Sequence, residues 1–144
     1  MPRTPTRAAL ALTLAAALAP AAAPAQQSDL ERFEAAAEAM AGQMFDLLAQ
    51  EQPRVADMLP DPAWDDAYRE AGACVLARIR DETSPAAVER MLGRMEELAA
   101  AEYDSLAELR GANAGTAAGL PQERMAEINR DCGMQRVMME RFSQ

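Results

Sequence analysis

Apolar residues recur at helical spacing along most of the chain, and this pattern predicts helices throughout. The first helical segment is expected from about Asp29 to Glu51, with Ser28 or Asp29 as its cap and Pro53 limiting its end. Steps of three and four residues give it one apolar seam, made of Leu30, Phe33, Ala37, Met40, Met44 and Leu47. β-branched residues are few, whereas Ala, Leu, Met, Glu, Gln and Arg dominate. The sequence therefore predicts an all-α protein.

Two further helices are predicted by an N-cap residue followed by proline. Asp61-Pro62 is expected to open a second helix and Ser84-Pro85 a third, because proline suits the first helical position. The second helix carries its broad apolar face on Trp64, Ala67, Tyr68, Ala71, Cys74, Val75 and Ile79. The third carries its stripe on Val88, Met91, Leu92, Met95, Leu98, Leu106 and Leu109. The stretch 99–103 interrupts that stripe, and we expect a bend there.

The glycine-rich stretch near 111–119 separates the last helix from the others. It holds three glycines and no large apolar residue, which is typical of a flexible loop. The last helix is expected from near Pro121 to about Phe142. With short connections, these segments predict one compact up-and-down bundle of about four helices, spanning a single domain over 26–144.

The only two cysteines, Cys74 and Cys132, are predicted to form a disulfide. Each lies within an apolar helical stripe, and small residues beside them (Ala71 to Ala73 and Gly133) permit the close approach that a disulfide requires. No Cys-x-x-Cys, lysine or histidine is present to activate a thiol. The predicted bridge links the second helix to the last one.

Residues 1–25 have the features of a cleaved signal peptide. Arg3 and Arg7 precede an apolar run of about a dozen residues, which is short for a membrane span. Ala23-Pro24-Ala25 supplies small residues for cleavage, so Gln26 is the expected first mature residue. The alternative is an uncleaved anchor. Together with an arginine-only, alanine-rich composition, this segment indicates an exported bacterial protein, periplasmic or secreted, with no membrane insertion after cleavage.

Charge and composition exclude several classes of function. Without the signal, 12 arginines face 23 acidic residues, a net charge of −11 that disfavours nucleic acid and anionic lipid as partners. The chain has no histidine, which removes the commonest acid–base group and the commonest metal ligand. Asp57, Asp61, Asp65 and Asp66 cluster before and within the start of the second helix, but capping and the helix dipole account for the last three. We expect neither a catalytic site nor a resident metal or cofactor.

A few aromatic and thioether side chains are the remaining candidates for binding. Trp64, Tyr68 and Tyr103 are placed to line a pocket, although core packing explains their spacing equally well. Met134 and Met138 lie partly off the main stripe of the last helix, where methionine suits a pliable apolar surface.

The sequence therefore favours a non-enzymatic exported protein that acts by protein–protein contact. It would work as a chaperone-like protein or an accessory subunit, with another exported protein as its partner. The alternative is a carrier of a small apolar ligand or of a metal ion such as Cu(I), which methionine sulfur can bind.

Overall fold

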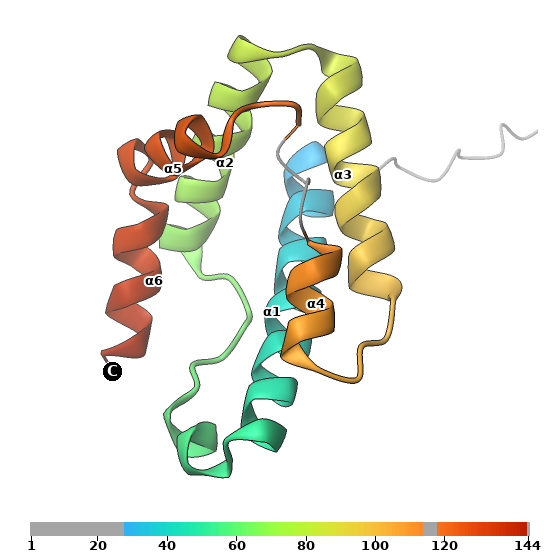
Figure 1. Ribbon diagram of the computed structural model, residues 1–144. Coiled ribbons are helices and arrows are strands. Elements are labelled where there is room, and N and C mark those ends of the chain that lie inside the picture. The colour runs from blue at the N-terminus through green and yellow to red at the C-terminus, as the bar shows by residue number, and fades with distance from the viewer. Residues whose placement is uncertain (1–27, 114–117, 144) are drawn as a thin grey trace, which may run out of the picture.

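The described residues of the computed structural model, 28–113 and 118–143, are helical and contain no strand (Figure 1). The elements are α1 (Asp29–Glu51), the 3₁₀-helix η1 (Pro53–Met58), α2 (Asp66–Glu82), α3 (Pro85–Ala100), α4 (Leu106–Ala112), α5 (Gln122–Asp131) and α6 (Met134–Phe142). The all-α prediction is confirmed. The expectation of about four helices is not exact, because two of the predicted helices are each divided in the structure.

Both divisions have a local cause. The third predicted helix ends at Ala100, the backbone is extended at Ala101, and Ser105 caps α4 by accepting a hydrogen bond from the Glu108 N–H. The last predicted helix is divided at Gly133, whose φ of 76° belongs to the left-handed region that glycine adopts readily. The first break falls where the apolar stripe is interrupted and a bend was expected, but the chain leaves the helix there altogether. At the second break apolar residues at helical spacing lie on both sides of Gly133, which is why the pattern alone suggested one helix.

The start of α2 differs from the sequence-based expectation. The helix begins at Asp66, and Asp65 is its N-cap, accepting a 2.8 Å hydrogen bond from the Tyr68 N–H. Asp61 caps a turn instead, because its carboxylate accepts a 2.8 Å hydrogen bond from the Ala63 N–H. The Asp-Pro pair therefore lies within the irregular connection between η1 and α2 rather than opening the helix.

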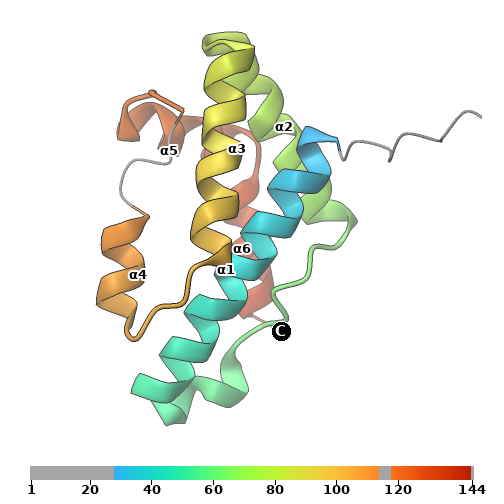
Figure 2. The same cartoon turned by 90° about the vertical axis from the view of Figure 1, so that its right-hand side faces the viewer.

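The helices form two loosely joined groups. One group is the α1–α3 pair, and the other is α2 with α5 and α6 (Figures 1 and 2). Arg32 of α1 donates to Glu89 and Glu96 of α3, at 2.7 and 2.6 Å. Arg69 of α2 pairs with Glu34 of α1. Ion pairs thus tie α1 to both α3 and α2 along its outer faces.

The apolar core consists of two clusters, the larger of which joins α3 of the first group to the helices of the second. The main cluster lies among α2, α3, α5 and α6, and its buried members are Ala71, Val75, Leu76, Ile79, Val88, Met91, Leu92, Ile128, Met134 and Val137. A smaller cluster joins the end of α1 to α4 through Leu47, Leu106 and Leu109. The Leu106 N–H also donates to the Glu51 carboxylate at 2.9 Å, which fixes α4 beside the end of α1.

The predicted disulfide is confirmed. Cys74 in α2 and Cys132, the C-terminal cap of α5, are bonded with their Cα atoms 5.6 Å apart. Gly133 follows directly and turns the chain into α6, so the bridge and the turn together hold α5 and α6 against α2.

Two expectations concern residues at or beyond the edges of the described chain. The predicted signal peptide lies outside the described residues. Of the predicted loop at 111–119, Gly111 and Ala112 close α4, and Ala118 and Gly119 form a turn with positive φ angles of 52° and 85°. Positions 114–117 lie outside the described residues.

None of the described helices is both long and apolar enough to span a bilayer.

Candidate functional site

Two adjoining apolar cavities lie between α1 and the helices that face it. The first has a volume of about 250 Å³ and is bounded by α1, α6 and the connection before α2. The second, of about 440 Å³, is bounded by α1, α2, α3, α4 and α5. The residues that line both are Phe33, Ala37, Ala41, Met44, Met95 and Asn129. We call the two cavities together the methionine-lined cleft.

The cleft exists because the two apolar clusters do not merge. Val75 and Ile79 of the main cluster line one part of the second cavity, and Leu106 and Leu109 of the smaller cluster line another. Between them α1 presents small side chains, Ala37 among them, that do not fill the gap. Protein interiors are normally packed with few voids larger than water, so an apolar space of this size is a candidate ligand site.

Methionine is the most frequent large residue in the lining. Seven of the ten methionines contribute to it: Met40, Met44, Met91, Met95, Met125, Met134 and Met138. The thioether side chain is unbranched and polarisable, and it adopts many shapes at low cost. Such a wall suits apolar ligands of variable shape.

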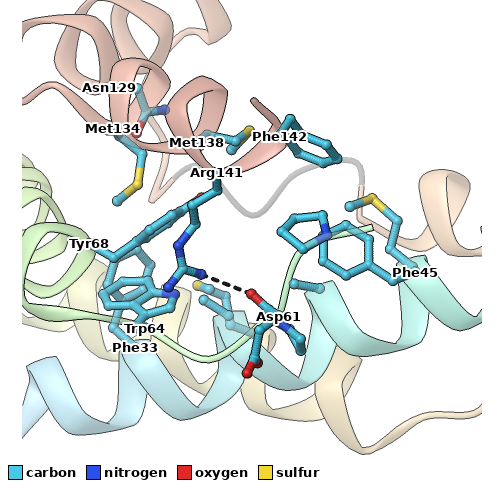
Figure 3. A pocket seen from close by; sticks show the side chains of 16 residues that line it. Phe33, Phe45, Asp61, Trp64, Tyr68, Asn129, Met134, Met138, Arg141 and Phe142 are labelled. Carbon is cyan, nitrogen blue, oxygen red and sulfur yellow. Dashed lines mark hydrogen bonds between the residues drawn. The ribbon is translucent and has the colours of Figure 1, made fainter. Parts of the chain in front are cut away.

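An aromatic cluster forms one wall of the first cavity (Figure 3). The Trp64 ring meets Phe33 edge-on, with centroids 5.5 Å apart, and lies 5.4 Å from the Tyr68 ring. The Trp64 backbone N–H donates to the Glu38 carboxylate of α1 at 2.5 Å. On its other side the ring lies so close to Gly72 that a Cβ there would be 2.3 Å from a ring carbon. The absence of a side chain at Gly72 therefore positions the tryptophan.

Arg141 of α6 closes the polar edge of the first cavity. Its guanidinium donates to the Asp61 carbonyl at 2.9 Å and lies 4.7 Å from the centre of the Tyr68 ring (Figure 3). It also donates to the Asp65 carboxylate at 3.2 Å. The pKa of Asp65 is lowered, mainly by the Tyr68 N–H and also by Arg141. Burial raises the pKa of Tyr68. The arginine thus fixes the connection before α2 against α6.

Apolar side chains surround the opening of the first cavity. Met44, Met138 and Phe142 line it while remaining 40, 46 and 51 % exposed. Phe142 meets Phe45 of α1 edge-on, with centroids 6.1 Å apart, and so bridges α6 and α1 across the opening. Met139 of α6 is 71 % exposed but lines neither cavity.

Four of the five predicted binding residues meet in one place. Trp64, Tyr68, Met134 and Met138 all line the first cavity. Tyr103 lies elsewhere, against the smaller cluster, with its hydroxyl donating to the Leu98 carbonyl at 3.3 Å.

Several lining residues were not singled out from the sequence. They include Phe33, Phe45, Arg110 and Arg141. The run of small residues on α1 was the one available signal, since a helix face with Ala37 and Ala41 cannot fill a wide gap.

The carboxyl groups act in ion pairs between helices. Each carboxyl group in the described chain with a clearly shifted pKa has it lowered, and for Glu34, Glu82 and Glu96 the main cause is a hydrogen bond from an arginine. Such groups stay ionised at neutral pH. No three His, Cys, Asp or Glu side chains within 28–113 and 118–143 are grouped to hold a metal ion.

Comparison of the chain with protein-family models, with curated proteins and with solved structures finds no match in any of the three.

Proposed function

We propose that this protein is a non-enzymatic carrier that holds an apolar ligand in the methionine-lined cleft. The observation that carries the proposal is the pair of adjoining cavities, about 250 and 440 Å³, walled almost entirely by apolar side chains. Ligand sites typically range over roughly 300–1,000 Å³ and combine an apolar lining with a few polar groups. Arg141 and Asn129 supply such polar groups at the edges of the cleft.

An exported setting supports this proposal. The Cys74–Cys132 bridge persists best in an oxidising compartment, which agrees with the predicted signal peptide. A carrier in an aqueous compartment outside the cytoplasm must shield its ligand from water, and a cleft inside a helical bundle does so. The negative charge of the chain keeps such a protein soluble.

The experiment that tests the proposal uses N-phenyl-1-naphthylamine, an uncharged dye that brightens in apolar surroundings. The chain has one tryptophan, Trp64, and it lines the first cavity, so dye in the cleft accepts excitation energy from it. We expect saturable binding at one site. Ala41 lines both cavities, and an Ala41→Phe substitution would fill the space between them.

The matched control is Ala39→Phe on the same helix. Ala39 is exposed and lines neither cavity. We expect Ala41→Phe to weaken dye binding at least tenfold while Ala39→Phe leaves it unchanged, with both variants showing the wild-type circular dichroism spectrum. Equal binding by the two variants would place the dye outside the cleft and refute the proposal.

A second candidate function is contact with another exported protein through the opening of the first cavity. It is supported by the exposed side chains there, chiefly Met44, Met138 and Phe142 at 40, 46 and 51 % exposure. Exposed apolar patches of this kind are common at protein-binding sites. Suppression of client aggregation that survives in Ala41→Phe would favour this function, because that variant fills the cleft and leaves its rim intact.

A further inference from the structure

The second cavity is apolar apart from a small set of polar residues. Arg110 of α4 is its only charged lining residue in the described chain, and Asn113 and Asn129 are the other polar ones. Arg110 is exposed, so its guanidinium is available to water while the side chain borders the apolar space. An arginine at the border of an apolar cavity is suited to an anionic group whose remainder is apolar.

Arg110 also differs from most other arginines of the chain. Within 28–113 and 118–143, nine of twelve arginines form ion pairs: Arg32, Arg69, Arg78, Arg80, Arg94, Arg124, Arg130, Arg136 and Arg141. The three without an ion pair in this part of the chain are Arg54, Arg90 and Arg110. Only Arg110 of these three lines either cavity of the cleft.

We propose that the ligand of the cleft is a single-chain amphipath with an anionic head, whose head pairs with Arg110 and whose acyl chain occupies the cavities. This inference rests on the proposed function and names its substrate class. At roughly 30 Å³ for each water-sized group, the 440 Å³ of the second cavity holds on the order of a dozen chain carbons. A longer chain continues into the first cavity, past the shared residues Ala37 and Ala41.

Because the protein is negatively charged overall, added salt should affect an ion pair with Arg110 and purely apolar binding in opposite directions. The net charge is −9 for the full sequence and −11 without residues 1–25, so the protein repels anions at long range and a cleft that merely binds apolar groups would disfavour a carboxylate head. Added salt would then strengthen carboxylate binding by screening the repulsion. If the carboxylate pairs directly with Arg110, added salt should instead weaken carboxylate binding, because salt screens the ion pair.

The test measures binding of dodecanoate and dodecanol to the mature protein at pH 8, by displacement of N-phenyl-1-naphthylamine. The two probes share a twelve-carbon chain and differ in the head. We expect dodecanoate to bind more weakly as NaCl rises, relative to dodecanol at the same salt. This measurement uses the wild-type chain and does not depend on any variant. A relative strengthening of dodecanoate binding by salt would overturn the proposal.

Two charge-matched variants locate the anion. Arg110→Gln is expected to weaken dodecanoate binding about fivefold, the size for an exposed ion pair, and to leave dodecanol binding unchanged. Arg90→Gln removes the same charge from an exposed position on α3 that lines neither cavity, and it should change neither. Equal losses in both variants would show a general field effect and overturn the assignment to Arg110.

A third probe distinguishes the two sources of such a ligand. Lauroyl-lysophosphatidylglycerol carries the same acyl chain on an anionic phospholipid head. Displacement of the dye by this lipid that is weaker in Arg110→Gln than in wild type would support the proposal, as would the same result with dodecanoate. The tighter of the two identifies a lysophospholipid or a free fatty acid as the source. If the dye and dodecanol bind but Arg110→Gln weakens the binding of neither anionic probe, this inference is overturned and the carrier function remains supported. Failure of every probe, the dye included, overturns both.

Discussion

A single methyl group at Gly72 should displace the aromatic wall of the first cavity. Gly72 is buried in α2, and a Cβ built there would lie 2.3 and 2.5 Å from two carbons of the Trp64 ring. Real Cβ atoms do not approach other atoms so closely, and therefore the ring must move. Gly93 lies inside α3, and a Cβ there would meet nothing within 4 Å. Gly72→Ala and Gly93→Ala thus add the same methyl group, which collides with the Trp64 ring at position 72 and meets nothing at position 93.

The magnitudes follow from two opposing effects. Alanine stabilises a helix interior by about 0.5–1 kcal/mol relative to glycine, and this gain applies to both variants. At Gly93 nothing opposes the gain, so we expect that variant to be more stable than wild type by that amount. Overpacking of a core costs about 1–3 kcal/mol, and at Gly72 the cost falls on Trp64. We therefore expect a net loss of roughly 1–2 kcal/mol in the free energy of unfolding for Gly72→Ala.

The assay combines thermal unfolding with tryptophan fluorescence. For a chain of this size, each kcal/mol shifts the melting temperature by about 4 °C, so the two variants should melt on opposite sides of wild type. Trp64 is the only tryptophan, and its emission reports directly on its environment. We expect a red shift in Gly72→Ala, because the ring leaves its apolar contacts with Phe33 and Tyr68. Gly93→Ala should keep the wild-type spectrum.

A double variant tests the assigned cause. In a Trp64→Ala background the obstacle is gone, and Gly72→Ala should then stabilise the protein as much as Gly93→Ala does. Equal melting temperatures for the two single variants, with unchanged emission, would refute the placement of Trp64 against α2. The aromatic wall of the first cavity would then be wrong as well.

Two further predictions concern the disulfide and acid stability. Replacing Cys74 and Cys132 by alanine should lower the free energy of unfolding by about 4 kcal/mol in the chain-entropy model, given a sequence separation of 58 residues; denaturant titration measures it, and an unchanged midpoint would contradict it. The pKa of Glu96 is lowered by its hydrogen bond to Arg32, so its contribution to stability is full above the unfolded value near 4.5 and is lost as pH falls through the folded value. Melting temperatures measured from pH 7 to pH 2 should therefore fall less steeply below about pH 4.5 in Glu96→Gln than in wild type. The control is Glu70→Gln, which removes a carboxylate that has no ion-pair partner in the described chain. Its melting temperatures should follow those of wild type.

The sequence predicted helix starts well where a capping side chain acts locally. Ser28 and Ser84 cap α1 and α3 as their positions indicated, since a cap needs only the next three residues. Asp61-Pro62 carries the same signal, but Asp61 lies four residues before the actual cap, Asp65. The signal failed there because the Asp61 carboxylate is equally well satisfied by a turn.

The candidate site was predictable in its parts and not in its assembly. Met134 and Met138 are four residues apart within α6, so they share one side of that helix. Trp64 precedes α2 and meets Tyr68 through ring contact, with centroids 5.4 Å apart. That these pairs lie across one cavity depends on α6 packing along α2. The turn at Gly133 and the Cys74–Cys132 bridge set that packing; the turn is local, whereas the bridge joins residues 58 positions apart in the chain.

By itself the sequence determined the helical class, the disulfide and the apolar seam of α1. These follow from local spacing, from capping and from the pairing of the only two cysteines. Only the tertiary structure decided what the seam would face. Of its six predicted residues just Leu47 is fully buried in the core, while Phe33, Ala37, Met40 and Met44 line the cleft. Local spacing fixes which side of a helix is apolar, but whether the opposing helices fill the space against it is a property of the whole packed chain.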